Sequence, residues 1–316
     1  MARRTVSPEA YRRVTLLAVL ALGFIMVTGA AVRLTGSGLG CPDWPNCDEG
    51  RLIAPLEVQP MVEFVNRCIT GLVSISIILA VLGSLRRQPR RKDLVWLSLG
   101  LVGGVVAQIV LGKFTVDYDL DPRFVMSHFL LSIVMVANVV VLHWRASQPD
   151  QGEVRPLVRP TVALMASLVT ACTAVVVFLG TVVTGAGPHG GDEDARRLDV
   201  SLHRAAQVHG LTVVLLVVLV VATLVLLWRT GAPTAVRRRG LALLGVLVAQ
   251  GAVGYAQYFS GVPALLVGIH VAGAVAVWST ALWFQLGMKE RAGPLGAAVA
   301  GVAERRRQLV GTPAPS

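Results

Sequence analysis

The sequence predicts an all-α integral membrane protein in which eight transmembrane helices form two pseudo-symmetric four-helix bundles. Three observations predict this fold class. Hydrophobic residues make up 54% of the 316 residues and charged residues only 15%, whereas about a quarter of the residues in a soluble domain are charged. Long charge-free runs recur along the chain. Two of them share a spaced pattern of Gln, Gly and His, which indicates an internal repeat.

The charge-free runs have lengths near the ~20 residues that cross a bilayer core. They are Val14–Val32, Cys68–Leu85, Leu94–Gly112, Phe124–Trp144, Pro160–Gly191, Ala205–Trp228 and Gly240–Met288. The last run is long enough for two spans, and the segment Tyr255–Pro263 divides it because Gly and Pro interrupt helices. We expect the first run to be a retained span, because it is longer than the apolar core of a cleaved signal and no A-x-A site follows it.

The net charge of +11 is unevenly distributed between the predicted loops. If the N-terminus is inside, 21 of the 29 Lys and Arg residues lie on the inner side, and 12 of the 18 acidic residues lie on the outer side. This is the positive-inside asymmetry of membrane proteins. It predicts a multi-pass protein of the cell membrane with both termini in the cytoplasm. The basic clusters are therefore interpreted as topology signals and contacts to anionic lipid, and nucleic-acid binding is not expected.

The internal repeat relates the third and fourth spans to the seventh and eighth. Gln108, Gly112 and His128 recur 142 residues later as Gln250, Gly254 and His270. The letters "VTGA" also occur near the outer ends of the first and fifth spans. Because each half has an even number of spans, we expect a parallel repeat about an axis along the membrane normal.

The repeat and the composition of the connecting segments predict the domain limits. The N-terminal bundle is expected to span 1–145 and the C-terminal bundle 161–290. A polar, proline-bearing cytoplasmic linker covers 146–160, and a small-residue tail with a basic run, 291–316, is expected to be disordered.

Histidines at membrane depth are the first candidate functional residues, since ionisable groups there are costly. His209 and His270 both lie about 10 Å below the outer helix ends. Two imidazoles at equal depth in a bundle suit the axial positions of a haem iron. Zinc requires a third or fourth ligand, and these two spans offer no Cys or carboxylate.

The first half is not a copy of the second. It has Asn66 and His128 where the second half has His209 and His270, so one histidine leaves a weakly held or open coordination position. Glu63 lies one turn before Asn66 on the same helix face, where a carboxylate beside a cofactor can move protons or stabilise a developing cation. The spacing equally favours a simple ion pair between Glu63 and Arg67.

Two further pairs of residues lie near the outer helix ends. Arg33 and Arg67 are candidates for contacts to haem propionates, and the alternative is that they reach to the lipid head groups. Cys41 and Cys47 fall in an outer loop, where disulfides persist, and the turn-rich residues between them allow the two to meet. The alternative is two unpaired thiols.

Several stretches together resemble the haem A synthase family. They are "TGSGLGCPDWPNC", "EFVNR", "SHFLLS", "TGAGPHGGD", "QVHG" and "GIHVAGA", and they cover the chain from the first to the eighth span. The resemblance is to a variant, of an actinobacterial type, with Asn at position 66 in place of one of the histidines of the first half.

The resemblance implies an oxidoreductase that converts haem O to haem A by oxidising a ring methyl to a formyl group, with water as the oxygen source. It implies haem B in the C-terminal bundle with His209 and His270 as axial ligands, and haem O in the N-terminal bundle with His128 as ligand and Glu63 as catalytic residue. It also implies an outer-loop disulfide between Cys41 and Cys47, and connects the chain to a haem O synthase and a haem-A-containing terminal oxidase.

Two other functions fit the same residues. One is a di-haem electron-transfer cytochrome or quinone reductase, which leaves the porphyrin type unchanged. The other is a haem transporter, which has no turnover. The appearance of haem A in cells that make haem O discriminates the three.

Overall fold

The computed structural model of the chain describes residues 5–41, 47 and 53–293. Its eight long helices are α1 (Pro8–Leu34), α2 (Val58–Arg86), α3 (Lys92–Asp117), α4 (Pro122–Ala146), α5 (Pro160–Ala186), α6 (Leu202–Arg229), α7 (Thr234–Phe259) and α8 (Ala264–Leu286). All eight are long and apolar enough to cross a membrane. The predicted fold class is therefore confirmed. The part of the predicted tail from 294 to 316 lies outside the described residues.

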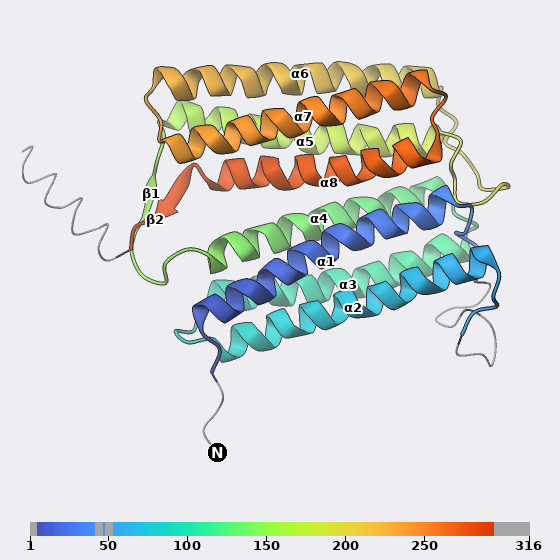
Figure 1. Ribbon diagram of the computed structural model, residues 1–316, viewed down its shortest axis with the longest axis horizontal. Coiled ribbons are helices and arrows are strands. Elements are labelled where there is room, and N and C mark those ends of the chain that lie inside the picture. Colours follow the sequence, from blue (N-terminus) through green and yellow to red (C-terminus); the bar gives the residue numbers. More distant parts are fainter. Residues whose placement is uncertain (1–4, 42–46, 48–52, 294–316) are drawn as a thin grey trace, which may run out of the picture.

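The helices form two groups that lie side by side (Figure 1). In each group the helices pack in a ring: α1 with α2, α2 with α3, α3 with α4 and α4 with α1 in the first, and α5 to α8 in the same order in the second. The helices lie antiparallel to their chain neighbours, so one end of the molecule carries the start of α1 and the linker after α4 (Figure 1). We call it the basic end, and the opposite end, with the loop of Cys41, the disulfide end.

The helix bounds repeat along with the sequence pattern. Helices α3 and α7 both have 26 residues and begin 142 residues apart, at Lys92 and Thr234. Helices α1 and α5 both have 27 residues, but they begin 152 residues apart, at Pro8 and Pro160. The offset changes because the loop after α1 is longer than the loop after α5.

The two groups meet along α1, α4, α5 and α8. Trp278 of α8 is buried there and donates from Nε1 to the carbonyl of Ile133 in α4, at 2.9 Å. At the disulfide end, the backbone N–H of Gly38 donates to the carbonyl of Gly191, at 2.9 Å, so the loops after α1 and α5 are joined. A Cβ on Gly38 would lie 2.8 Å from a methyl group of Leu120 and 3.1 Å from the carbonyl oxygen of Gly191, so the two loops cross closely at this glycine.

Large apolar side chains cover the outward faces of the helices, as a lipid environment requires. Leu20, Leu72, Leu211 and Leu265 are each more than 60% exposed. Aromatic residues gather near the helix ends, which is typical of the membrane–water interfaces. Trp96, Trp228 and Trp283 lie at the basic end, and Tyr118, Tyr255 and Tyr258 lie at the disulfide end.

The linker contains structure that the sequence analysis did not anticipate. Strand β1 (Val154–Pro156) pairs antiparallel with β2 (Lys289–Arg291), so the linker joins the segment after α8. Asp150 accepts from Nη2 of Arg87 at 2.6 Å, and the guanidinium of Arg87 is only 1% exposed. The linker is thereby attached to both halves at the basic end.

Candidate functional site

Two histidines of the second half lie near one another, one on α6 and one on α8. His209 and His270 are partly buried and close enough to interact electrostatically. His209 Nδ1 lies 3.1 Å from the carbonyl oxygen of Val176. Because a carbonyl only accepts hydrogen bonds, Nδ1 carries the proton and the Nε2 lone pair is left for a metal.

Glycines make room for both imidazole rings. A Cβ on Gly180 would lie 3.4 Å from His209 Cε1, and a Cβ on Gly254 would lie 3.1 Å from His270 Cε1. Larger residues at either position would push on the ring. The amide of Gln250 donates to the backbone carbonyl of His270 at 2.9 Å, which fixes the start of α8 against α7.

The first half repeats this arrangement around His128. Gln108 Nε2 donates to the carbonyl of His128 at 3.1 Å, and a Cβ on Gly112 would lie 3.7 Å from His128 Cε1. His128 and His270 are each the seventh residue of their helix. The repeated Gln, Gly and His thus share their contacts: Gln holds the backbone of the histidine, and Gly lies against its ring, tightly in the second half and at ordinary contact distance in the first.

The other side of the first half departs from the repeat. Thr28 Oγ1 donates to Asn66 Oδ1 at 2.9 Å. By the offset of α1 and α5, Thr28 corresponds to Gly180, and by the offset of the last residues of α2 and α6, Arg86 and Arg229, Asn66 corresponds to His209. A glycine beside a histidine in one half is therefore replaced by a hydrogen-bonded Thr–Asn pair in the other. The sequence analysis missed Thr28, because the shared letters "VTGA" pair it with Thr184 and only the helix bounds pair it with Gly180.

Glu63 lies on α2, one turn from Asn66, and its side chain is 9% exposed. Its Oε1 accepts from Arg67 Nη2 at 2.6 Å, so the ion pair that the spacing left open is present. Its Oε2 accepts from the backbone N–H of Cys41 at 2.9 Å. Two donors, one on each oxygen, hold this buried carboxylate in a fixed orientation.

The Cys41 amide reaches Glu63 because the loop after α1 packs closely on the start of α2. A Cβ on Gly40 would lie 2.6 Å from the backbone of Gln59, so only glycine permits this approach. A disulfide joins Cys41 to Cys47, and both are buried in a small cluster with Ala54 and Phe64. The residues between the two cysteines lie outside the described part of the chain.

Arg33 does not lie beside Glu63 in this network. Its Nη2 donates to the carbonyl of Thr184 at 3.0 Å, which connects the end of α1 to the end of α5. Arg33 therefore stabilises the contact between the two halves at the disulfide end.

The histidines of the two halves have the chemistry of haem ligands. The buried Nδ1 atoms of His128 and His270 have no hydrogen-bond partner among the residues that the structure describes, and such orphaned groups indicate an incomplete site. Across residues 5–41, 47 and 53–293, no three His, Cys, Asp or Glu side chains converge as a structural zinc site requires. Two imidazoles with glycine beside each ring fit a flat macrocycle held through its iron.

Similarity to known proteins agrees with a haem-binding site. A family model described as COX15-CtaA, cytochrome oxidase assembly protein, matches residues 12–188, more than half of the chain. The chain is 33% identical over 137 residues to a protein named heme A synthase from Lysinibacillus sphaericus, covering 42% of this chain and 44% of that protein.

Other relatives have the same name. The heme A synthase of Listeria welshimeri is 28% identical over 174 residues, covering 54% of this chain and 57% of that protein. That of Staphylococcus saprophyticus is 30% identical over 129 residues, covering 40% and 43%. The chain thus spans about half the length of the curated relatives it matches. On the extent of the family match, the chain belongs to the COX15-CtaA family of cytochrome oxidase assembly proteins.

Proposed function

We propose that this protein is a haem A synthase, which oxidises a ring methyl of haem O to a formyl group with oxygen from water. One observation carries the proposal. The second half has a pair of neighbouring histidines, and the first half has His128 at the position that matches His270, with the buried carboxylate of Glu63 one turn from Asn66. The names of the relatives support it.

In this proposal His209 and His270 hold haem B as a permanent group. When bound, haem B supplies a one-electron redox centre. The protein contributes the orientation of the ligands: Val176 fixes the tautomer of His209, and Gln250 fixes the backbone of His270. Such contacts behind a ligand hold the ring in position and strengthen it as a donor.

The first half is proposed to receive haem O with His128 as its only protein axial ligand. Asn66 is engaged by Thr28, and an amide is a poor ligand for iron. A substrate held by one imidazole exchanges more readily than a group held by two. The asymmetry of the halves therefore matches a division between a fixed cofactor and an exchanging substrate.

Glu63 is proposed as the catalytic residue. Converting a methyl group and one water to a formyl group releases four electrons and four protons, and the electrons pass to an external acceptor. A carboxylate whose Oε1 faces Arg67 and whose Oε2 faces the Cys41 amide is held in one place. It can stabilise positive charge that develops on the substrate and accept a proton from the attacking water.

The protein is proposed to lie in the cell membrane with the basic end in the cytoplasm. The excess of Lys and Arg at that end supports this orientation. Residues 1–145 then form the substrate half, residues 161–290 the haem B half, and both ends of the chain are cytoplasmic. A haem O synthase supplies the substrate, and a terminal oxidase that contains haem A receives the product.

The test is to extract haem from cells that make haem O, with and without this protein. Haem A is expected only with the protein. Glu63→Ala is expected to keep haem B and to accumulate haem O or a partly oxidised product. Glu57→Ala is the matched control, because Glu57 is exposed at the start of the same helix. Unchanged haem O with the wild-type chain would contradict the proposal and favour a cytochrome or a transporter.

A further inference from the structure

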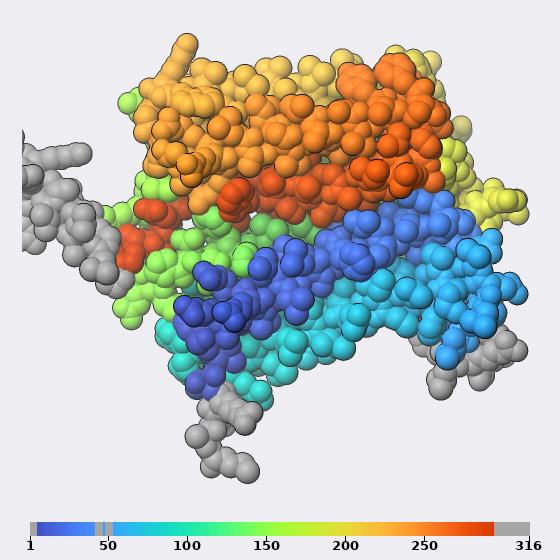
Figure 2. Space-filling model, in the orientation of Figure 1, coloured from blue at the N-terminus to red at the C-terminus, as the bar shows by residue number. Residues whose placement is uncertain are grey.

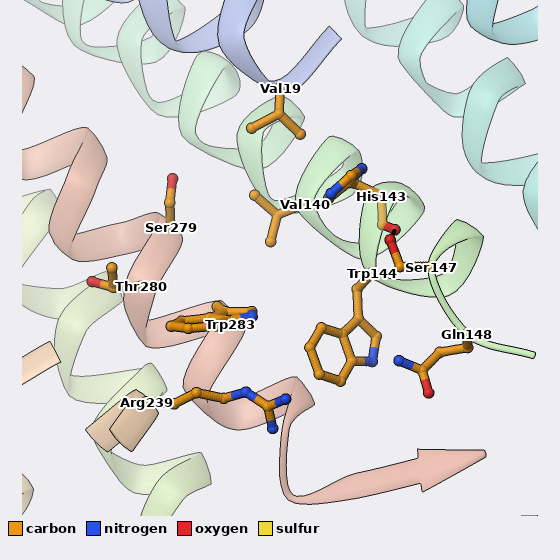
Figure 3. Close-up of a pocket in the computed structure, with 10 residues that line it drawn as sticks. All are labelled: Val19, Val140, His143, Trp144, Ser147, Gln148, Arg239, Ser279, Thr280 and Trp283. Carbon is orange, nitrogen blue, oxygen red and sulfur yellow. Dashed lines mark hydrogen bonds between the residues drawn. The ribbon is translucent and has the colours of Figure 1, made fainter. Parts of the chain in front are cut away.

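A pocket of about 480 Å³ lies at the basic end, far from the histidine sites (Figure 3). Its lining comes from both halves: Val19 of α1, three residues of α4 (Val140, His143 and Trp144), Ser147 and Gln148 directly after α4, Arg239 of α7, and Ser279, Thr280 and Trp283 of α8. His143 in its wall is 15 residues from His128 along α4, or about 22 Å. The pocket is therefore separate from the proposed haem sites.

The pocket holds a guanidinium between two indole rings. Arg239 Cζ lies 4.9 Å from the ring centre of Trp144 and 5.4 Å from that of Trp283. Figure 3 shows the guanidinium pointing into the space between the two rings. Stacking on aromatic faces holds an arginine in position and leaves its N–H edge available.

The charge of Arg239 has no close partner in the described part of the chain. Its Nη1 donates to the carbonyl of Gly287 at 3.3 Å, and none of the described carboxylates lies within 4.0 Å of it; Glu290 acts only at longer range. A guanidinium has five N–H donors, so most of them are left for a ligand. A Cβ on Gly287 would collide with this side chain, so the chain makes room for it.

The position of the pocket favours a lipid over a soluble anion. Ser147 and Gln148 line the pocket toward the helix ends, and Val19 and Val140 line it toward the middle of the membrane, together with the hydroxyls of Ser279 and Thr280. Figure 2 shows α4 in green at the floor of the seam between α8 and α1, and α1 and α8 diverge toward the basic end (Figure 1). In a phospholipid, likewise, the polar phosphate head group lies toward the membrane surface and the apolar acyl chain lies toward the middle of the membrane.

We propose that this pocket binds the phosphodiester of an anionic phospholipid, with Arg239 as the phosphate ligand and an acyl chain along the seam between the halves. Basic pockets between transmembrane helices on the cytoplasmic side are suited to such head groups. The lipid bridges α4 of the first half and α7 and α8 of the second. The proposal does not depend on the haem chemistry, and its failure would leave the proposed function untouched.

The test uses the full chain purified in detergent and titrated with phosphatidylglycerol, with phosphatidylcholine or with inorganic phosphate. Binding is followed by native mass spectrometry and thermal unfolding. We expect phosphatidylglycerol to bind and to raise the melting temperature more than phosphatidylcholine does. Equal effects of the two lipids would refute the claim that the ligand is anionic. An effect of inorganic phosphate alone would refute the claim that the ligand is a lipid.

Variants identify the residue. Arg239→Gln is expected to weaken phosphatidylglycerol binding about fivefold or more, whereas Arg238→Gln, which removes an exposed neighbouring charge, leaves it unchanged. Equal affinities of the two variants would overturn the proposal. If Arg239→Gln does not fold, Arg239→Lys decides, because it keeps the charge and loses the planar fork. If the Arg239→Lys variant then bound phosphatidylglycerol as tightly as the wild type, the assignment of Arg239 as a planar phosphate ligand would be contradicted.

Discussion

Thr28 Oγ1 donates a hydrogen bond to Asn66 Oδ1 at 2.9 Å in the first half of the molecule. At the corresponding place in the second half, Gly180 lies against the ring of His209. The two differences are coupled, because the atoms of a threonine beyond Cβ would occupy the space that the imidazole needs. The first half therefore accommodates the amide of Asn66. We expect that a histidine introduced at position 66, with Thr28 still in place, does not fit as His209 does.

The double variant Thr28→Gly/Asn66→His should restore the second ligand. We expect it to bind its substrate haem through two histidines, with an additional low-spin signal and slower haem exchange than the wild type. Absorption and paramagnetic resonance spectra of the purified protein measure the first, and transfer of haem to apomyoglobin measures the second.

The two single variants distinguish the effect of removing the threonine side chain from the effect of adding a histidine ligand. Asn66→His alone should give little of the new low-spin signal, since Thr28 remains in place. Thr28→Gly alone should give none. A full signal from Asn66→His alone would show that the threonine does not control the site.

Gly254 should be required for the fit of His270. A Cβ there would lie 3.1 Å from His270 Cε1, and overpacking of this kind typically costs about 1–3 kcal/mol. Gly254→Ala is therefore expected to weaken haem B binding about tenfold, measured by titrating haem into the apoprotein. Gly251→Ala is the control, because a Cβ at Gly251 meets no atom within 4 Å. His270→Ala gives the signal expected when haem B binding is lost completely. Equal haem B affinities of the two glycine variants would refute the claim that a Cβ at position 254 crowds the His270 ring.

The loop closed by the disulfide should be required for the formation of haem A and not for the binding of haem B. Cys47→Ser releases the loop that brings the Cys41 amide to Glu63. We expect haem A formation to fall at least several-fold while the low-spin spectrum of haem B is unchanged. Cys172→Ser controls for the loss of a thiol, since Cys172 is a free cysteine in α5. Loss of haem B in Cys47→Ser would instead indicate a general structural role.

Asp121 should make the stability of the protein depend on acid pH. The side-chain hydrogen bond from Arg123 lowers the pKa of Asp121 to about 2, and the side chain also caps α4 by accepting from the Arg123 amide. A lowered pKa stabilises the fold above the usual value near ~3.9, and this contribution is lost as the pH falls toward 2.

The measurement is the thermal unfolding of Asp121→Ala in detergent. Loss of the cap should destabilise the protein by about 1 kcal/mol at neutral pH, and the difference from the wild type should shrink between pH 4 and pH 2. Asp199→Asn, which changes an exposed loop carboxylate, should follow the wild type. A difference that stays constant with pH would exclude the ionised carboxylate as its source.

Much of the fold follows from the sequence because lipid imposes a strong constraint. A span must be apolar and about 20 residues long, so the charge-free runs locate all eight helices. The repeat also follows, because Gln250 and Gly254 act on His270 through contacts set by helix geometry, and these contacts fix the spacing.

Other features depend on contacts between distant segments. The pairing of Val154–Pro156 with Lys289–Arg291 involves short polar stretches that have no alternation to indicate a strand. The bond from the Cys41 amide to Glu63 uses the backbone, which carries no sequence signal. Arg33 is a candidate for haem propionates from its place near a helix end, and nothing in the sequence indicates its hydrogen bond to Thr184 of the other half. Helix faces and depths do not predict such partners.

The difference between the two haem positions is the central claim, and counting axial histidines tests it most directly. The wild-type protein, purified with both haems, should give one low-spin paramagnetic resonance signal of a bis-histidine haem. That signal should disappear in His209→Ala and persist in His128→Ala. Two bis-histidine signals in the wild type, or one that is lost in His128→Ala and kept in His209→Ala, would contradict the account.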